Sequence, residues 1–363
     1  MVKITTIKEK EAILSLNEEI EQFLKDRGAI KVGFATKETL AGPPNADITY
    51  IIPEAKSAIS YALPFDKEII REYLSKKSFA NHEKNRFDLN YGSVKISSEL
   101  AAWLKEKGFN AKSIISNNNY KKEIKDWKAI MPPRLSHRYV AVASGVGSFG
   151  WSGNVGIKGI GTTILLGTIV TTAKLEPTKP IPPEESFCTK CKLCTKVCTA
   201  SMFSKDEEVK FTLGGVEYTH AKRNGYVRCQ YVCGGFTGLH PSKKWSTWSP
   251  GRFPIPETNM EIYKMMGKAL RRYPNWPERT DCEGGYINEA APGINIRLTC
   301  GMCQNICWAN TKDTAENYKI LTNSGCIIQN PDGSMVVLPP KEAEQHFNSL
   351  PKKHRRKYSV ERA

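Results

Sequence analysis

Apolar positions in the first half of the chain follow helical and strand spacings in turn. Over residues 9–26 they recur every three or four positions, which is the spacing of one face of an amphipathic helix. Residues 162–172 read TTILLGTIVTT instead, a β-branched run typical of a buried strand. The spacing of apolar residues predicts helices at 9–26, 66–75, 93–107 and 135–143, and strands at 30–35, 57–63, 111–116 and 162–172. Strands that alternate with helices indicate a layered α/β architecture.

Local signals mark the limits of several of these elements. Pro64 stops one strand, and Gly108 ends a helix for which Ser93 is a candidate N-cap. Residues 178–185 are rich in proline and charge and are predicted to be a linker. The glycines of residues 144–154, SGVGSFGWSGN, could let backbone amides approach a phosphate or a flat cofactor. Their spacing fits neither the dinucleotide fingerprint nor the P-loop, so a plain turn is an equal alternative.

All eleven cysteines lie after residue 187, and seven of them are regularly spaced. They form a Cys-x2-Cys-x2-Cys-x3-Cys run and a shorter Cys-x2-Cys-x3-Cys run, made of Cys188, Cys191, Cys194 and Cys198, and of Cys300, Cys303 and Cys307. The first spacing is that of bacterial ferredoxins, in which three thiolates hold one cluster and the fourth reaches a second cluster. The shorter run lacks one ligand, and Cys229 is our choice to complete it.

We therefore predict two [4Fe–4S] clusters whose ligands cross between the runs. The two expected sets are Cys188, Cys191 and Cys194 with Cys307, and Cys229, Cys300 and Cys303 with Cys198. Cys233 is the rival of Cys229, while Cys282 and Cys326 are spare. A pair of structural zinc sites is the alternative, although zinc favours two separated Cys-x2-Cys pairs.

Two adjacent clusters form a path for electrons, and such a path needs something to reduce. The 187 residues that precede the first ligand far exceed what a simple ferredoxin needs. We expect this cysteine-free part to carry the terminal redox centre and the substrate pocket. The whole sequence contains no Cys-x-x-Cys-His haem motif and no Asp-x-His-x-x-Gly corrinoid motif, so a bound cobalamin would have no obvious histidine ligand.

The chain resembles the corrinoid and iron–sulfur reductases, which comprise reductive dehalogenases and epoxyqueuosine reductases. The similar segments are AVASGVGSFGWSG, GTTILLGTIVTTAKLEPTKPI, ESFCTKCKLCTKVC and CGMCQNICWAN. The resemblance implies a nitroreductase-like α/β domain that binds base-off cobalamin, and a ferredoxin-like domain with two [4Fe–4S] clusters. We place these domains at 1–178 and 179–330, with an insert at about 234–295 and a basic tail at 331–363. The implied cofactor-binding residues are Gly145, Gly147, Thr162, Thr163 and Leu166.

The same resemblance suggests a proton donor. Dehalogenases of this family use a tyrosine before a helix that ends at a glycine, and Tyr91 occupies that place. A phenol near the cobalt could protonate a carbanion-like product, with a nearby cation lowering its pKa. Arg134, His137 and Arg138 are the candidate cations.

Two departures bear on the substrate. Epoxyqueuosine reductases carry an acidic residue about fourteen positions before the glycine turn, where this chain has Met131, and Asp126 lies five residues too early. This difference favours a dehalogenase-like enzyme that cleaves a carbon–halogen bond in a small organohalide with two electrons and a proton. The segment between Cys229 and Cys300 is also longer than is usual in the family, and it could form a lid.

Charge keeps two other functions open. Lys and Arg number 53 against 37 Asp and Glu, a formal net charge of +16, and residues 352–357 are the most basic patch. This excess favours an anionic partner, either tRNA in epoxyqueuosine-reductase-like chemistry or an acidic low-potential donor such as ferredoxin or flavodoxin. An electron-transfer protein without catalysis is the third hypothesis. No apolar run is long enough for a membrane span, and without an export signal we expect a cytoplasmic oxidoreductase.

Overall fold

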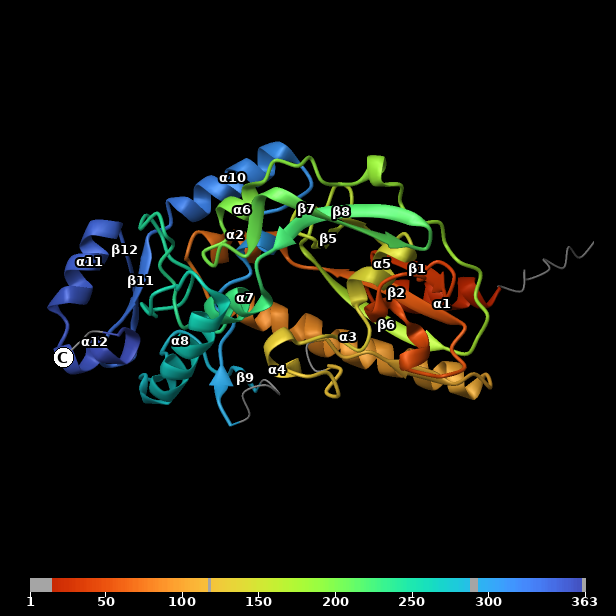
Figure 1. Cartoon of the computed structure of the whole chain (residues 1–363), viewed down its shortest axis with the longest axis horizontal. Coiled ribbons are helices and arrows are strands. Elements are labelled where there is room, and N and C mark those ends of the chain that lie inside the picture. Colours follow the sequence, from red (N-terminus) through yellow and green to blue (C-terminus); the bar gives the residue numbers. More distant parts are fainter. Residues whose placement is uncertain (1–14, 117–118, 288–292, 361–363) are drawn as a thin grey trace, which may run out of the picture.

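A four-stranded sheet organises the first half of the chain in the computed structural model, which describes residues 15–116, 119–287 and 293–360 (Figure 1). The strand order is β1-β2-β6-β3, and every neighbouring pair is antiparallel. The strands are β1 (Lys31–Thr36), β2 (Ser57–Pro64), β3 (Ala111–Ser113) and β6 (Ile164–Thr171). The four predicted strands are confirmed, and their antiparallel pairing makes the fold a mixed α and β structure without parallel crossovers.

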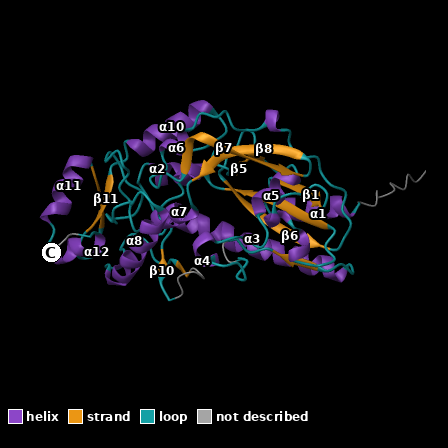
Figure 2. Ribbon diagram, viewed as in Figure 1, coloured by secondary structure: helices purple, strands orange, loops and turns teal. Residues whose placement is uncertain are grey.

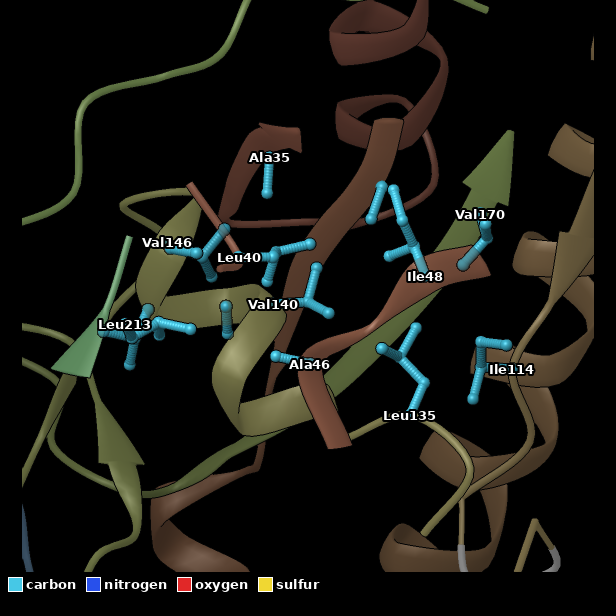
Figure 3. Close-up of a cluster of buried hydrophobic side chains, with 14 of the residues drawn as sticks. Ala35, Leu40, Ala46, Ile48, Ile114, Leu135, Val140, Val146, Val170 and Leu213 are labelled. Carbon is cyan, nitrogen blue, oxygen red and sulfur yellow. The ribbon is translucent and has the colours of Figure 1, made fainter. Parts of the chain in front are cut away.

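Both faces of this sheet are covered, which explains why β2 is buried along nearly its whole length. Side chains alternate between the faces of a strand, so Ala58 and Ala62 enter one core while Ile59 and Tyr61 enter the other. Figure 3 shows the first core, to which Val140 and Leu213 also belong. The second core lies under α1 (Leu16–Lys25) and α3 (Ala80–Glu106).

Helix α3 is longer than the sequence predicts. It begins thirteen residues before Ser93 and continues through Gly92, so Ser93 lies inside the helix. Its carbonyl accepts a hydrogen bond of 2.8 Å from the Tyr61 hydroxyl of the sheet below. A glycine inside a helix costs only about 1 kcal/mol, and the packing of a 27-residue helix on the sheet outweighs that cost.

The remaining predicted helices form close to their expected limits. Helix α1 starts at Leu16 behind a capping box of Ser15 and Glu18, and the predicted residues 9–14 lie outside the described part of the chain. The other helices of the first half are α2 (Lys67–Leu74), α4 (Trp127–Ile130) and α5 (His137–Ala143). Two short strands, β4 (Ser148–Phe149) and β5 (Val155–Gly156), pair within the glycine-rich segment.

The second half wraps back onto the first. A hairpin of β7 (Phe203–Leu213) and β8 (Val216–Arg223), absent from the elements predicted above, places Leu213 and Tyr218 in the first core. A further core combines Tyr73 and Phe79 with Trp245, Trp248 and Ile306. Packing therefore continues across the linker that the sequence predicts near residue 180.

Four of the eleven cysteines lie in short helices, six lie in loops and one lies in a strand. Figure 2 shows how helices, strands and loops alternate in this half. The helices of the second half are α6 (Leu193–Lys196), α7 (Tyr226–Cys233), α8 (Asn259–Arg272), α9 (Met302–Asn305), α10 (Thr311–Thr322), α11 (Pro340–Ser349) and α12 (Lys352–Tyr358). The strands are β9 (Tyr286–Ile287), β10 (Asn295–Ile296), β11 (Cys326–Gln329) and β12 (Met335–Leu338). None of the described helices has the length and apolar character needed to cross a membrane.

The predicted basic tail is folded. It contributes β12, α11 and α12, which lie at the opposite end of the long axis from α1 (Figure 1). His354 and Tyr358 of α12 are buried, and both side chains hydrogen-bond to Gln329, at 2.8 and 2.9 Å. These contacts hold the helix to the hairpin and leave Lys352 and Lys353 exposed.

Candidate functional site

The first group of thiols surrounds one small cavity. Cys188, Cys191, Cys194 and Cys307 line it together, although Cys307 is more than a hundred residues from the others. The pairing of α6 with α9 brings the two runs together. Lys190 and Lys192, between the first three cysteines, have positive φ angles of 53° and 56°, so the loop turns tightly enough for its thiols to face inward.

The pKa shifts of these thiols reflect how close they lie to one another. Burial raises the pKa of Cys194 to about 12, and the nearby thiols of Cys303 and Cys307 raise it as well. The pKa of Cys307 is raised by burial and by Cys188 and Cys191. Thiolates this close repel one another in the absence of a compensating cation, which is the situation of a metal-binding group of thiols.

A second group of thiols lies deeper in the molecule. Burial raises the pKa of Cys229 far above its ordinary value, and Cys233 adds most to this effect, followed by Cys303, Cys300 and Cys198. Burial raises the pKa of Cys233 to about 12, Cys300 and Cys303 raise it as well, and Arg86 lowers it. The surroundings of Cys229 therefore contain all three expected partners.

Hydrogen-bond donors point at sulfur atoms in both groups. The backbone amides of Trp151 and Met202 donate to Cys188 and Cys198, each at 3.3 Å. Such donors stabilise iron–sulfur clusters and tune their potentials. Among the described residues, no group of three or more His, Cys, Asp or Glu side chains lies close enough together to hold a single metal ion.

A cavity of about 610 Å³ lies beside the second group. Its walls come from α3, α5, β6 and α7, where the sheet meets the cysteine-bearing segments. Apolar side chains such as Ile164 and Leu166 form one part of the lining, and Arg138, Arg223 and Tyr226 form another. This volume is within the usual range of ligand and cofactor sites.

The structure brings four of the residues singled out in the sequence to this cavity. They are His137, Arg138, Thr162 and Leu166. The Thr162 hydroxyl donates to the carbonyl of Gln304 at 2.7 Å, and its amide donates to the carbonyl of Cys307 at 2.9 Å. Thr162 therefore connects the sheet, the cavity and the segment that carries Cys307.

The other predicted cofactor-binding residues do not line the cavity. A Cβ on Gly145 would lie 2.3 Å from the Lys179 carbonyl oxygen, so this glycine permits a close backbone approach instead. A Cβ on Gly147 would meet the β5 segment at 2.6 Å. The Thr163 hydroxyl donates to the carbonyl of Ile160 within its own turn. Gly145 and Gly147 therefore permit close packing of the backbone and do not contact the cavity.

The predicted catalytic constellation is not assembled. Tyr91 is 68% exposed and is not among the residues that line the cavity, because α3 turns Asn90 inward instead. Arg134 stacks over the Tyr50 ring, 5.3 Å from its centroid, outside the cavity. His137 does line the cavity, but burial lowers its pKa to about 4, so it is neutral near pH 7 and is not the expected cation.

Three polar residues at the cavity carried no sequence signal. Arg86 is paired with Glu83 at 2.7 Å. Burial lowers the pKa of Arg223 to about 10, and the neighbouring Arg138 lowers it further. Tyr226 is 41% exposed, and burial by surrounding protein raises its pKa. The last two lie six and three residues before Cys229, and no recognisable motif marks them.

Reductases are among the solved structures that are similar to this chain. No family model and no curated protein matches the chain. The catabolic reductive dehalogenase NpRdhA is 16% identical with a TM-score of 0.44, and the match covers 59% of this chain and 29% of that one. An epoxyqueuosine reductase from Bacillus subtilis is 16% identical with a TM-score of 0.39, and the match covers 84% and 80%. An epoxyqueuosine reductase with an epoxyqueuosine-modified tRNA-Tyr stem loop is 16% identical with a TM-score of 0.40, and the match covers 84% of this chain and 80% of that one. These are the two enzyme classes that the sequence resembles, and the chain spans less than a third of the dehalogenase.

Proposed function

We propose that this protein is a two-[4Fe–4S], cobalamin-dependent reductase whose activity resembles reductive dehalogenation. The observation that carries the proposal is the order of three sites. A thiol group with the exposed Cys191 comes first, a buried thiol group around Cys229 follows, and the 610 Å³ cavity adjoins the second group. This order suits electrons that enter at the surface and reach a buried substrate.

We propose that the cysteines divide between the two clusters in the crossed arrangement. Cys188, Cys191, Cys194 and Cys307 would hold the outer cluster. Cys198, Cys229, Cys300 and Cys303 would hold the inner one. When bound, these clusters carry electrons one at a time, and a low-potential donor such as ferredoxin or flavodoxin would supply them near Cys191.

A corrinoid in this cavity would be held without His137 as a metal ligand. Both ring nitrogens of His137 are engaged, by Thr168 at 2.8 Å and Ser116 at 3.2 Å. The side chain therefore has no free nitrogen for a metal. The apolar wall at Leu166 can lie against a flat macrocycle and exclude water. When bound, the corrinoid supplies the cobalt-centred reduction of a carbon–halogen bond.

The chain's own contribution is orientation and a proton. The overall reaction converts R–X, two electrons and one proton to R–H and a halide ion. Tyr226 is the donor we propose, because its side chain lines the cavity near Arg138. Burial raises the pKa of the phenol, and Arg138 is a cation that lowers this pKa and so favours release of the proton. This replaces Tyr91, which the fold directs to solvent.

The test is the cofactor content and turnover of anaerobically purified protein. We expect about eight iron atoms and one corrinoid per chain, and halide release from bromo- and chloroaromatic compounds with a low-potential reductant. Iron with no corrinoid would reduce the protein to an electron-transfer role. Zinc in place of iron would overturn the proposal.

Epoxyqueuosine-type reduction of tRNA is the second candidate. Helices α8 and α12 lie against each other and carry the exposed basic residues Lys264, Lys268, Arg271, Lys352 and Lys353. Such a surface suits a phosphate backbone. The position of the family's acid is occupied by Met131, which lines the cavity. Tight tRNA binding that weakens steeply with salt, together with nucleoside reduction, would favour this candidate over dehalogenation.

A further inference from the structure

The polar end of the cavity is strongly cationic. Arg138 of α5 and Arg223 at the end of β8 both line it, as does Arg86. No aspartate or glutamate is among the described residues that line this cavity. Only Arg86 has a carboxylate partner, Glu83, whereas no carboxylate of the described residues forms a salt bridge with Arg138 or Arg223.

A single loop fixes these two guanidinium groups side by side. Arg138 Nη1 donates to the carbonyl of Gly153 at 2.9 Å, and Arg223 Nη2 donates to the neighbouring carbonyl of Ser152 at 2.9 Å. Gly153 has φ +69°, and a Cβ there would lie 2.8 Å from Arg223 Nη2. The loop therefore aligns the two arginines and leaves most of their N–H groups available.

One of those N–H groups is buried without a partner. Arg223 Nε has no hydrogen bond among the described residues. A buried, unpaired donor on a charged group is costly, and two adjacent unpaired cations are costlier still. Natural structures keep such an arrangement where an anion completes it, and the planar fork of arginine suits a carboxylate or phosphate.

We propose that Arg138 and Arg223 form a recognition site for the oxyanion of the substrate, with the Tyr226 hydroxyl beside it. The substrate would then be a small acid with an apolar body, because Ile164, Leu165 and Leu166 line the same cavity. This inference deepens the proposed function, since it assumes that the cavity receives a substrate.

Two other anions could explain the same arginines. One is a phosphate group of the cofactor, and the other is the negative charge of the inner cluster near Cys229 and Cys303. The three explanations differ in what an arginine substitution changes. Loss of a substrate site affects the binding of small acids and leaves the cofactor content intact.

The experiment measures binding of benzoate to anaerobic holoprotein by calorimetry, with benzamide as the neutral control of equal size. We expect benzoate to bind, and Arg223→Gln and Arg138→Gln each to weaken it about 10- to 100-fold, the effect of losing a charged hydrogen bond. Benzamide binding should change little. Arg134→Gln removes an arginine outside the cavity and should leave benzoate affinity unchanged.

Cofactor measurements on the same samples separate the outcomes. Normal iron and corrinoid contents with weakened benzoate binding would support the inference. Binding of inorganic phosphate but not benzoate, together with corrinoid loss in the variants, would assign the arginines to the cofactor and overturn it. A shift only in the inner-cluster potential would overturn it as well. Wild-type protein without corrinoid would instead contradict the proposed function, and benzoate binding can still be measured on that protein.

Discussion

The side-chain amide of Asn154 lines the large cavity and donates to the sulfur of Cys303, with Nδ2 and Sγ 3.8 Å apart. One side chain thus touches both the cavity and the buried thiol group. The buried thiol group is therefore the one nearer the cavity, whereas the other group contains the exposed Cys191. A molecule bound in the cavity would therefore lie close to a cluster held by Cys303.

Replacing Asn154 should change the potential of the inner cluster alone. The Asn154→Leu variant removes a donor to sulfur, which disfavours the more negative reduced cluster and lowers its potential by about 20 to 60 mV, the equivalent of one net hydrogen bond. Redox titration followed by EPR measures the shift. Asn90→Leu changes a cavity asparagine whose amide donates to the carbonyl of Arg86, and it should leave both potentials unchanged. Equal shifts in the two variants would argue against a direct contact.

The crossing of ligands predicts which cysteines act together. Cys198→Ala and Cys229→Ala should damage the same EPR signal, and Cys307→Ala should damage the signal that depends on Cys188. Each substitution removes one of four thiolates, so about four iron atoms per chain become labile. Cys282→Ala is the control and should retain both signals. If Cys198→Ala instead abolishes the signal that depends on Cys188, the ligands do not cross.

The two tyrosines separate the structural assignment from the sequence-based one. Tyr226→Phe should keep iron and corrinoid but lower turnover about 100-fold or more, because the cavity loses its proton donor. Tyr91→Phe changes an exposed ring and should leave turnover near the wild-type value. Steady-state halide release measures both. The opposite ranking of these two variants would restore Tyr91 as the donor.

A buried lysine makes stability depend on pH. Lys76 is 5% exposed, donates to Ser324 Oγ, and lies near Cys326. Burial lowers its pKa from 10.5 to about 7. The unfolded chain therefore binds more protons between these values, so the free energy of unfolding rises with pH across this window and the penalty is complete below about pH 7.

Substituting this lysine should remove the penalty. Lys76→Met is expected to stabilise the fold at pH 6.5 by on the order of 2 to 4 kcal/mol, since each pKa unit corresponds to about 1.4 kcal/mol. The gain should shrink towards pH 10. Thermal unfolding at several pH values measures it, with the exposed neighbour Lys77→Met as the control. A gain that is the same at pH 6.5 and pH 10 would show that the charge is not the cause.

The sequence by itself determined the parts of this protein whose signals are local. Apolar spacing predicted β1, β2, β3 and β6, since a strand buried on both faces needs a continuous apolar run. Cysteine spacing predicted which thiols the fold would gather, because a short loop around a cluster leaves little freedom in its register. The resemblance to corrinoid and iron–sulfur reductases rests on the same segments.

Only the tertiary structure decided which side chains meet in the cavity. Packing on the sheet carries α3 past Gly92, and the resulting helix turns Asn90 inward and Tyr91 outward. Arg138 and Arg223 are distant in sequence, and they become neighbours because one loop accepts hydrogen bonds from both. Contacts between distant segments depend on how whole elements pack, so no local pattern of residues encodes them.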